Sequence, residues 1–206
     1  MTSPCIAIVT YRGVTAGEAA AFELVFSAVP GVRVALVGAE LGVVAGAGGT
    51  RRVTARFGDV TPDVVVVPGG LGSHRHLDVA AWIETVSPRI VVASSTGTAL
   101  LAAGGLLSGR RVATHWLAGS LVESFGAIVV DERVVVDGPF ITCQGSISAV
   151  DAGLRAVETM LGGEVADLTR AEMAARAVSP PNCGRTRSRW PRRRRSTSPR
   201  GGVPTA

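Results

Sequence analysis

The sequence contains no lysine: all 21 basic side chains are arginine, a bias typical of a GC-rich gene. Cysteine is also scarce, and an odd count at wide spacing (Cys5, Cys143, Cys183) excludes a complete disulfide framework. No stretch approaches the roughly 18 uninterrupted apolar residues of a membrane-spanning helix. The first residues lack the basic region and long apolar region of a secretory signal. We therefore expect a cytoplasmic protein without a membrane partner.

The formal net charge of +5 is distributed unevenly. Residues 182–206 hold eight arginines and no acid, which leaves 13 arginines against 16 acidic residues before them, a net charge near −3. An acidic body does not favour nucleic-acid binding. The Arg, Pro and Ser-rich tail has no apolar periodicity, so we expect it to be disordered. It is typical of a frameshifted GC-rich gene, the interpretation we favour, or of a nucleic-acid-binding arm. We expect one domain over residues 1–181 and a tail over 182–206.

Short runs rich in valine and isoleucine alternate with helical stretches along the chain. The predicted strands are 5–10, 33–37, 64–67, 90–93 and 111–114, and the predicted helices are 16–28, 78–86, 98–107, 117–124, 148–161 and 164–176. Residues 129–130, 134–136 and 140–143 follow one another closely and predict a small β-hairpin excursion. This alternation predicts an α/β fold, a doubly wound and mostly parallel sheet with helices on both faces.

The strongest local motif spans residues 90–98, where a buried strand passes through small residues into a helix-forming segment. A strand-to-helix turn of this kind places its apex residue above the sheet, beside the free amides of a helix N-terminus. Ser95 would occupy this apex, and Thr96 follows it. Serine and threonine are also common helix N-caps, and an isolated Ser-Ser-Thr-Gly run favours that simpler role. The neighbouring motifs at the same sheet edge favour a functional role for Ser95.

A glycine-containing loop, residues 67–72, follows another buried strand. Because the carboxyl ends of parallel strands meet at one edge of a sheet, this loop should lie beside Ser95. Alone, a Pro-Gly-Gly run is a turn. Beside Ser95, the amide of Gly70 together with that of Thr96 would form an oxyanion hole. The flanking candidates for substrate binding are Gly69 and Leu71.

One acid and two histidines are further candidates. Glu18 follows the first strand, where an acid most often complements the dipole of the helix it begins. Its alternative role is a catalytic acid directed at Ser95. His74, past the glycine loop, and His115, at a strand end, are candidates for substrate binding, although packed or exposed histidines are at least as common. Histidines without a regularly spaced carboxylate do not make a metal site, so we expect neither a metal nor another cofactor.

The order of these motifs resembles the ThiJ/PfpI family of the glutamine-amidotransferase-like superfamily, in its isonitrile hydratase branch. The similar segments are residues 65–70, the Ser95 turn with residues 100–116, and residues 136–142 with 145–151. The same domain is similar to the N-terminal sensor of AraC-type transcriptional regulators. The resemblance implies a flavodoxin-like fold, a homodimer, a nucleophilic cysteine at the turn and an acid after the first strand. Ser95 stands at the cysteine position and Glu18 at that of the acid.

The serine at the nucleophile position leaves two hypotheses. A helix N-terminus can activate a thiol, whereas a serine hydroxyl needs a strong neighbouring base, and no histidine follows Ser95. The first hypothesis is an enzyme of the isonitrile hydratase type, a hydro-lyase or hydrolase, in which Glu18 moves a proton and the Gly70 and Thr96 amides hold developing charge. The second is a non-catalytic ligand-sensing domain for transcription regulation, truncated before its helix-turn-helix. Both hypotheses require a small-molecule ligand.

Overall fold

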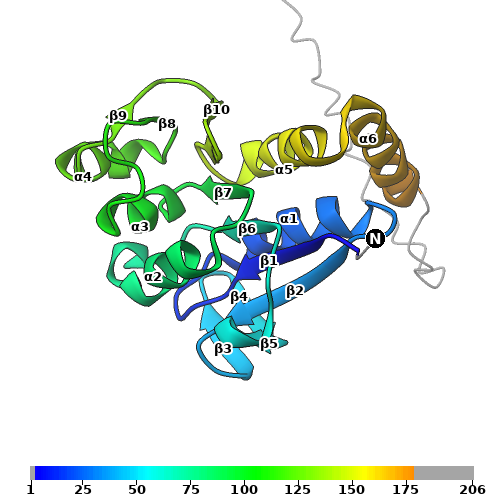
Figure 1. Cartoon of the computed structure of the whole chain (residues 1–206), viewed down its shortest axis with the longest axis horizontal. Coiled ribbons are helices and arrows are strands. Elements are labelled where there is room, and N and C mark those ends of the chain that lie inside the picture. The colour runs from blue at the N-terminus through cyan, green and yellow to red at the C-terminus, as the bar shows by residue number, and fades with distance from the viewer. Residues whose placement is uncertain (1–2, 179–206) are drawn as a thin grey trace, which may run out of the picture.

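The computed structural model describes residues 3–178, in which strands and helices alternate (Figure 1). The strands are Cys5–Val9 (β1), Arg33–Gly38 (β2), Gly42–Gly46 (β3), Gly49–Val53 (β4), Ala55–Arg56 (β5), Val64–Val67 (β6), Ile90–Ser94 (β7), Arg111–Val112 (β8), Ile128–Val129 (β9), Val134–Asp137 (β10) and Phe140–Cys143 (β11). The α-helices are Ala16–Ser27 (α1), Leu77–Val86 (α2), Gly97–Ala103 (α3), Gly119–Ser124 (α4), Ser146–Leu161 (α5) and Gly163–Val178 (α6). Short 3-10 helices cover Phe57–Asp59, Ser73–Arg75 and Trp116–Ala118.

A seven-stranded sheet with the order β10-β11-β7-β6-β1-β2-β5 forms the centre of the fold. Every neighbouring pair is parallel except the antiparallel pair β10 and β11. The predicted doubly wound, mostly parallel sheet is therefore confirmed. The chain adds β2 on one side of β1 and then β6 on the other, so the winding reverses between β1 and β6. Open α/β sheets place their ligands at such a reversal, beyond the carboxyl ends of the strands.

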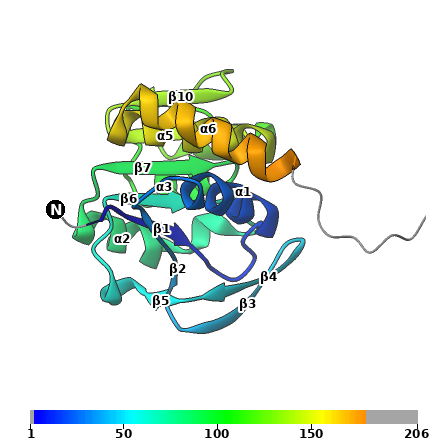
Figure 2. The same cartoon turned by 90° about the vertical axis from the view of Figure 1, so that its right-hand side faces the viewer.

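Helices cover both faces of this sheet, and β1 shows how the sequence separates them (Figures 1 and 2). Ile6 and Ile8 pack in a core with α1, α5 and α6, whereas Ala7 and Val9 pack in a second core with α2, α3 and α4. This alternation follows from the two-residue period of a strand. Because both faces are buried, a central strand such as β6 consists of four fully buried valines.

The predicted strand over residues 111–114 lies outside the main sheet. Only Arg111–Val112 form a strand, which pairs with β9 in a separate two-stranded sheet. The position beside β7 is taken instead by β11, which pairs with it in parallel. The hairpin predicted near residues 134–143 is present, but through β11 it forms the edge of the main sheet rather than an excursion from it.

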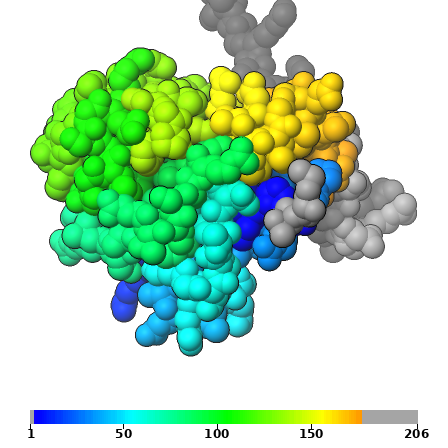
Figure 3. All heavy atoms as spheres, in the orientation of Figure 1, coloured from blue at the N-terminus to red at the C-terminus, as the bar shows by residue number. Residues whose placement is uncertain are grey.

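The β3–β4 hairpin is a feature that the sequence pattern did not predict. It projects at one end of the molecule, below β1 and β2 in Figures 1 and 3. Its turn reaches back to the loop after β1, where the Ala16 amide donates to the Ala47 carbonyl (2.9 Å) and the Ala47 amide donates to the Val14 carbonyl (2.8 Å). The hairpin therefore supports the loop that leads into α1.

Two further expectations concern a membrane-spanning helix and the tail. Across residues 3–178, no helix is both long and apolar enough to cross a bilayer. The tail predicted over residues 182–206, which includes Cys183, lies outside the described residues.

Candidate functional site

Ser95 lies at the turn between β7 and α3, as the sequence predicts. Its φ of 56° is in the left-handed region, which is uncommon for a residue with a side chain. Two hydrogen bonds hold this backbone: the Ser95 amide donates to the Cys143 carbonyl of β11 (2.9 Å), and the Ser95 carbonyl accepts from the Thr114 hydroxyl (2.8 Å). Neighbouring elements therefore fix Ser95 in a conformation that presents its side chain at the sheet edge.

Glu18 is buried at the same edge, with 3% of the residue exposed. Its Oε2 accepts hydrogen bonds from the Gly69 amide (2.8 Å) and the Ser94 hydroxyl (2.6 Å), and its Oε1 accepts a longer one from the Ser146 hydroxyl (3.3 Å). No cationic side chain of residues 3–178 forms an ion pair with it. Glu18 is in the first turn of α1, but its side chain binds three other segments. Its Oε1 is the oxygen more available to a ligand.

Gly69 separates Glu18 from Ser95. A Cβ added at Gly69 would lie 2.9 Å from Glu18 Oε2, 2.9 Å from Ser95 Cβ and 3.1 Å from Ser95 Oγ. No side chain fits there, so the loop requires glycine at this position. The expected convergence of the Ser95 turn, the glycine loop and Glu18 is thus present in the structure.

Tyr11 holds the glycine loop, residues 67–72, through a hydrogen bond. Its buried hydroxyl donates to the Pro68 carbonyl (2.6 Å). Burial, and secondly the charge of Glu18, raise the pKa of Tyr11 above its usual range. The phenol therefore stays protonated and remains a hydrogen-bond donor over the whole physiological range.

The backbone amides that would hold developing charge differ in their availability. The Gly70 amide donates to Thr96 Oγ1 (2.9 Å), and the same hydroxyl donates to the Gly70 carbonyl (2.9 Å). The predicted role of Gly70 therefore requires this bond to open. The amides of Thr96 and Gly97, at the start of α3, have no acceptor among the described residues. They are the unpaired donors at the Ser95 turn, although neither Thr96 nor Gly97 is among the residues that line the cleft described below.

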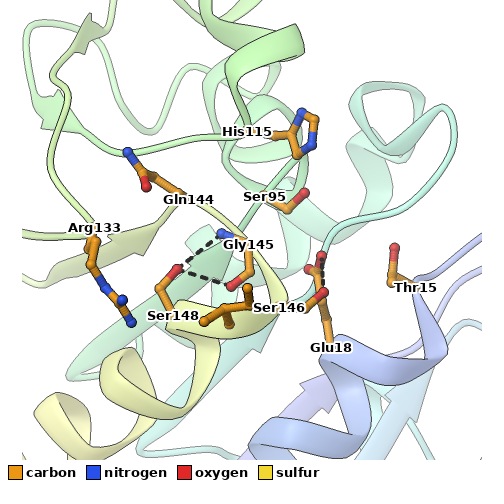
Figure 4. A pocket seen from close by; sticks show the side chains of 10 residues that line it. Thr15, Glu18, Ser95, His115, Arg133, Gln144, Gly145, Ser146 and Ser148 are labelled. Carbon is orange, nitrogen blue, oxygen red and sulfur yellow. Dashed lines mark hydrogen bonds between the residues drawn. The ribbon is translucent and has the colours of Figure 1, made fainter. Parts of the chain in front are cut away.

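A cleft of about 710 Å³ opens above these groups (Figure 4). This volume is in the range of small-molecule sites. The cleft contains three of the predicted residues and several that the sequence did not indicate. Its lining residues are Thr15, Glu18, Ser95, His115, Arg133, Gln144, Gly145, Ser146, Ile147 and Ser148.

Only some of the residues predicted to bind substrate line this cleft. His115 lines it, with its Nδ1 accepting from the Leu117 amide (3.2 Å). His74 belongs to a 3-10 helix that does not line the cleft, and Leu71 is 80% exposed outside it. Within residues 3–178, no group of three or more His, Cys, Asp or Glu side chains is arranged to hold a metal ion.

Cys143 is a thiol close to the Ser95 turn in the sheet register, opposite Ser94. It is fully buried in the core formed with α1 and α5. Burial raises the pKa of the Cys143 thiol to about 12, although a hydrogen bond with Ser148 opposes the shift. The thiolate is the reactive form of cysteine, so Cys143 does not supply the missing nucleophile.

Comparisons with known proteins agree with the motifs. The DJ-1/PfpI family model matches residues 6–159. Isonitrile hydratase of Pseudomonas putida is 32% identical over 164 residues, which cover 76% of this chain and 72% of that protein. The HTH-type transcriptional regulator CdhR of Pseudomonas aeruginosa is 37% identical over 73 residues, 34% of this chain and 22% of the regulator. A crystal structure of a ThiJ/PfpI family protein from Pseudomonas syringae is 25% identical, with a TM-score of 0.76 over 90% of this chain and 80% of that one.

Proposed function

This chain belongs to the DJ-1/PfpI family, and from this premise we propose that it is an enzyme of the isonitrile hydratase type that adds water to a small electrophilic substrate. The observation that carries the proposal is Glu18. This carboxyl group is almost completely buried, accepts hydrogen bonds but forms no ion pair with a cation of residues 3–178, and lies across Gly69 from Ser95. A buried acid facing a ligand cleft is suited to proton transfer rather than to surface solvation.

The chemistry requires proton transfer and charge stabilisation only. Hydration converts an isonitrile and water into a formamide: the terminal carbon gains the oxygen and one hydrogen, and the nitrogen gains the other. Glu18 Oε1, in its acid form, delivers a proton to the isonitrile carbon and receives one from the attacking water, which gives a formimidic acid. Transfer of the remaining hydroxyl proton to the nitrogen then gives the formamide. The Ser95 hydroxyl orients this water, and the free amides of Thr96 and Gly97 stabilise negative charge on the oxygen. The reaction consumes no oxidant and no cofactor.

Covalent catalysis by Ser95 is disfavoured, because no hydrogen bond links its hydroxyl to Glu18 or His115 in the described part of the chain. A serine without a bonded base is a poor nucleophile, and a thiol at a helix N-terminus is a better one. We therefore expect slow hydration of methyl or benzyl isonitrile by the parent protein. Ser95→Cys should raise kcat/KM by about tenfold or more, measured as formamide appearance by NMR.

Glu18→Gln tests the acid–base role directly. It preserves the shape of the side chain but removes the ionisable proton, so kcat should fall by roughly a hundredfold or more. Glu23→Gln is the matched control, because Glu23 is in the same helix and forms an ion pair with Arg51 away from the cleft. The proposal fails if neither the folded parent nor Ser95→Cys produces formamide.

A ligand-sensing domain is the second candidate, and the similarity to part of the regulator CdhR supports it. In this case small ligands should raise the melting temperature of the protein while no variant shows turnover.

The resemblance also leads us to propose a cytoplasmic homodimer. Light scattering should then give twice the 21.1 kDa chain mass.

A further inference from the structure

Arg133 lies across the cleft from the acid. It directly precedes β10 and is the only arginine among the described residues that line the cleft. Figure 4 shows its side chain beside Ser148 and Gln144, on the opposite side from Glu18 and Thr15. The cleft thus has a carboxyl group at one side and a permanent positive charge at the other.

Arg133 is not fully occupied by its protein partner. Its Nη2 donates to Asp151 Oδ2 (2.5 Å), and both side chains are more than half exposed, at 62% and 53%. Exposed ion pairs of this kind contribute little stability. A guanidinium carries five N–H donors, so a ligand can bind Arg133 beside Asp151 or in its place.

The start of α5 reinforces the positive side of the cleft. The amides of Ser146 and Ile147 have no acceptor among the described residues, and both residues line the cleft. α5 is 16 residues long, so its N-terminus carries the usual partial positive charge. Three negative charges oppose this positive side. Asp151 is paired with Arg133, and Asp131 accepts a hydrogen bond from the Gln144 side-chain amide (3.1 Å). Glu18 lies on the other side of the cleft.

From this arrangement we infer that the cleft selects small carboxylate-bearing ligands. The carboxylate binds Arg133, and the electrophilic carbon lies at Ser95 and Glu18. The identity of the ligand's reactive group rests on the proposed function, whereas the preference for a carboxylate is inferred from Arg133 and does not depend on it. For a hydration reaction, the matching substrate is isocyanoacetate, which takes up one water molecule and becomes N-formylglycine.

The binding test uses N-formylglycine and its neutral ethyl ester, which differ in charge, with calorimetry as the readout. The parent should bind the acid more tightly than the ester. Arg133→Gln should weaken binding of the acid by about tenfold or more, the loss of one charge-assisted hydrogen bond, and leave binding of the ester unchanged. Asp151→Asn should tighten binding of the acid, because it removes the competing carboxylate.

Arg155→Gln is the matched control, since Arg155 is also an arginine more than half exposed, pairs with Glu158 and does not line the cleft. It should bind both compounds as the parent does. Equal affinity of the parent for acid and ester would overturn the inference, and so would unchanged binding of the acid by Arg133→Gln.

Turnover separates this inference from the proposed function. Hydration of isocyanoacetate and of its ethyl ester at equal kcat/KM, unaffected by Arg133→Gln, would overturn the anionic preference and leave the hydratase proposal intact. Binding of N-formylglycine that depends on Arg133, without hydration of either isonitrile, would support the anionic preference while the hydratase proposal fails.

Discussion

Gly69 is the residue on which the geometry of the cleft depends most directly. Gly69→Ala would force its Cβ against Glu18 and Ser95, so the carboxyl group or the loop must move. We expect a loss of about 1–3 kcal/mol in the free energy of unfolding and a loss of ligand binding and of any hydration activity, measured by urea denaturation and calorimetry. Gly58→Ala is the control, since its added Cβ meets nothing within 4 Å. Equal stability and binding in the two variants would contradict this account of Gly69.

Single residues of the site differ in how far the sequence predicts them. Ser95 and Glu18 follow buried strands, and strand ends of a parallel sheet converge, so their proximity was predictable. Arg133 and Gln144 reach the cleft only because β11 takes the position beside β7. No local pattern carries that information. Ser146 and Ser148 give a weak signal, a glycine followed by serines at a helix start, which indicates capping rather than a ligand site.

At the scale of elements, the segment around β8 does not pair with the main sheet as a strand but is tied by hydrogen bonds to the Ser95 turn and to β11. Thr114 donates to the Ser95 carbonyl, and Thr98 of α3 donates to the Ala113 carbonyl (3.0 Å). Thr114→Val keeps the volume but leaves this buried carbonyl without the hydroxyl. We expect a loss of about 1–3 kcal/mol in unfolding free energy, by urea denaturation. Thr85→Val removes an exposed hydroxyl bond within α2 and should change stability far less; similar losses in both would refute a role of Thr114 beyond that of a surface threonine.

The elements that the sequence mispredicts have a common physical cause. Residues 112–114 are buried as a central strand would be, but their burial arises from packing against α3 and β11 instead of pairing in the main sheet. The β3–β4 hairpin is glycine-rich and mostly exposed, so no apolar alternation marks it. Competition between strands for a sheet position depends on the whole chain, whereas the central strands β1, β6 and β7 are determined by their own apolar runs.

The whole molecule should show an unusual response to alkaline pH, because it has no lysine and only one tyrosine, and arginine does not titrate below pH 12. Burial raises the pKa of Cys143 from 9.0 to about 12 in the fold. Between these values the unfolded thiol loses its proton while the folded one keeps it. The contribution of Cys143 to the free energy of unfolding is therefore fully present below pH 9 and falls as the pH rises. Cys143 should contribute a slope of about 1.4 kcal/mol per pH unit in this window.

Cys143→Ala tests this slope by urea denaturation between pH 8 and 11. The variant should start from a lower stability, because the buried sulfur is lost, but should lose less stability as the pH rises. Val92→Ala is the matched control: it opens a cavity in the same buried core without removing a titrating group, so it should lower stability equally at every pH. Because the pKa of Tyr11 is also raised by burial, some alkaline sensitivity should persist in Cys143→Ala. An unchanged slope in Cys143→Ala would show that its thiol ionises equally in the folded and unfolded chains.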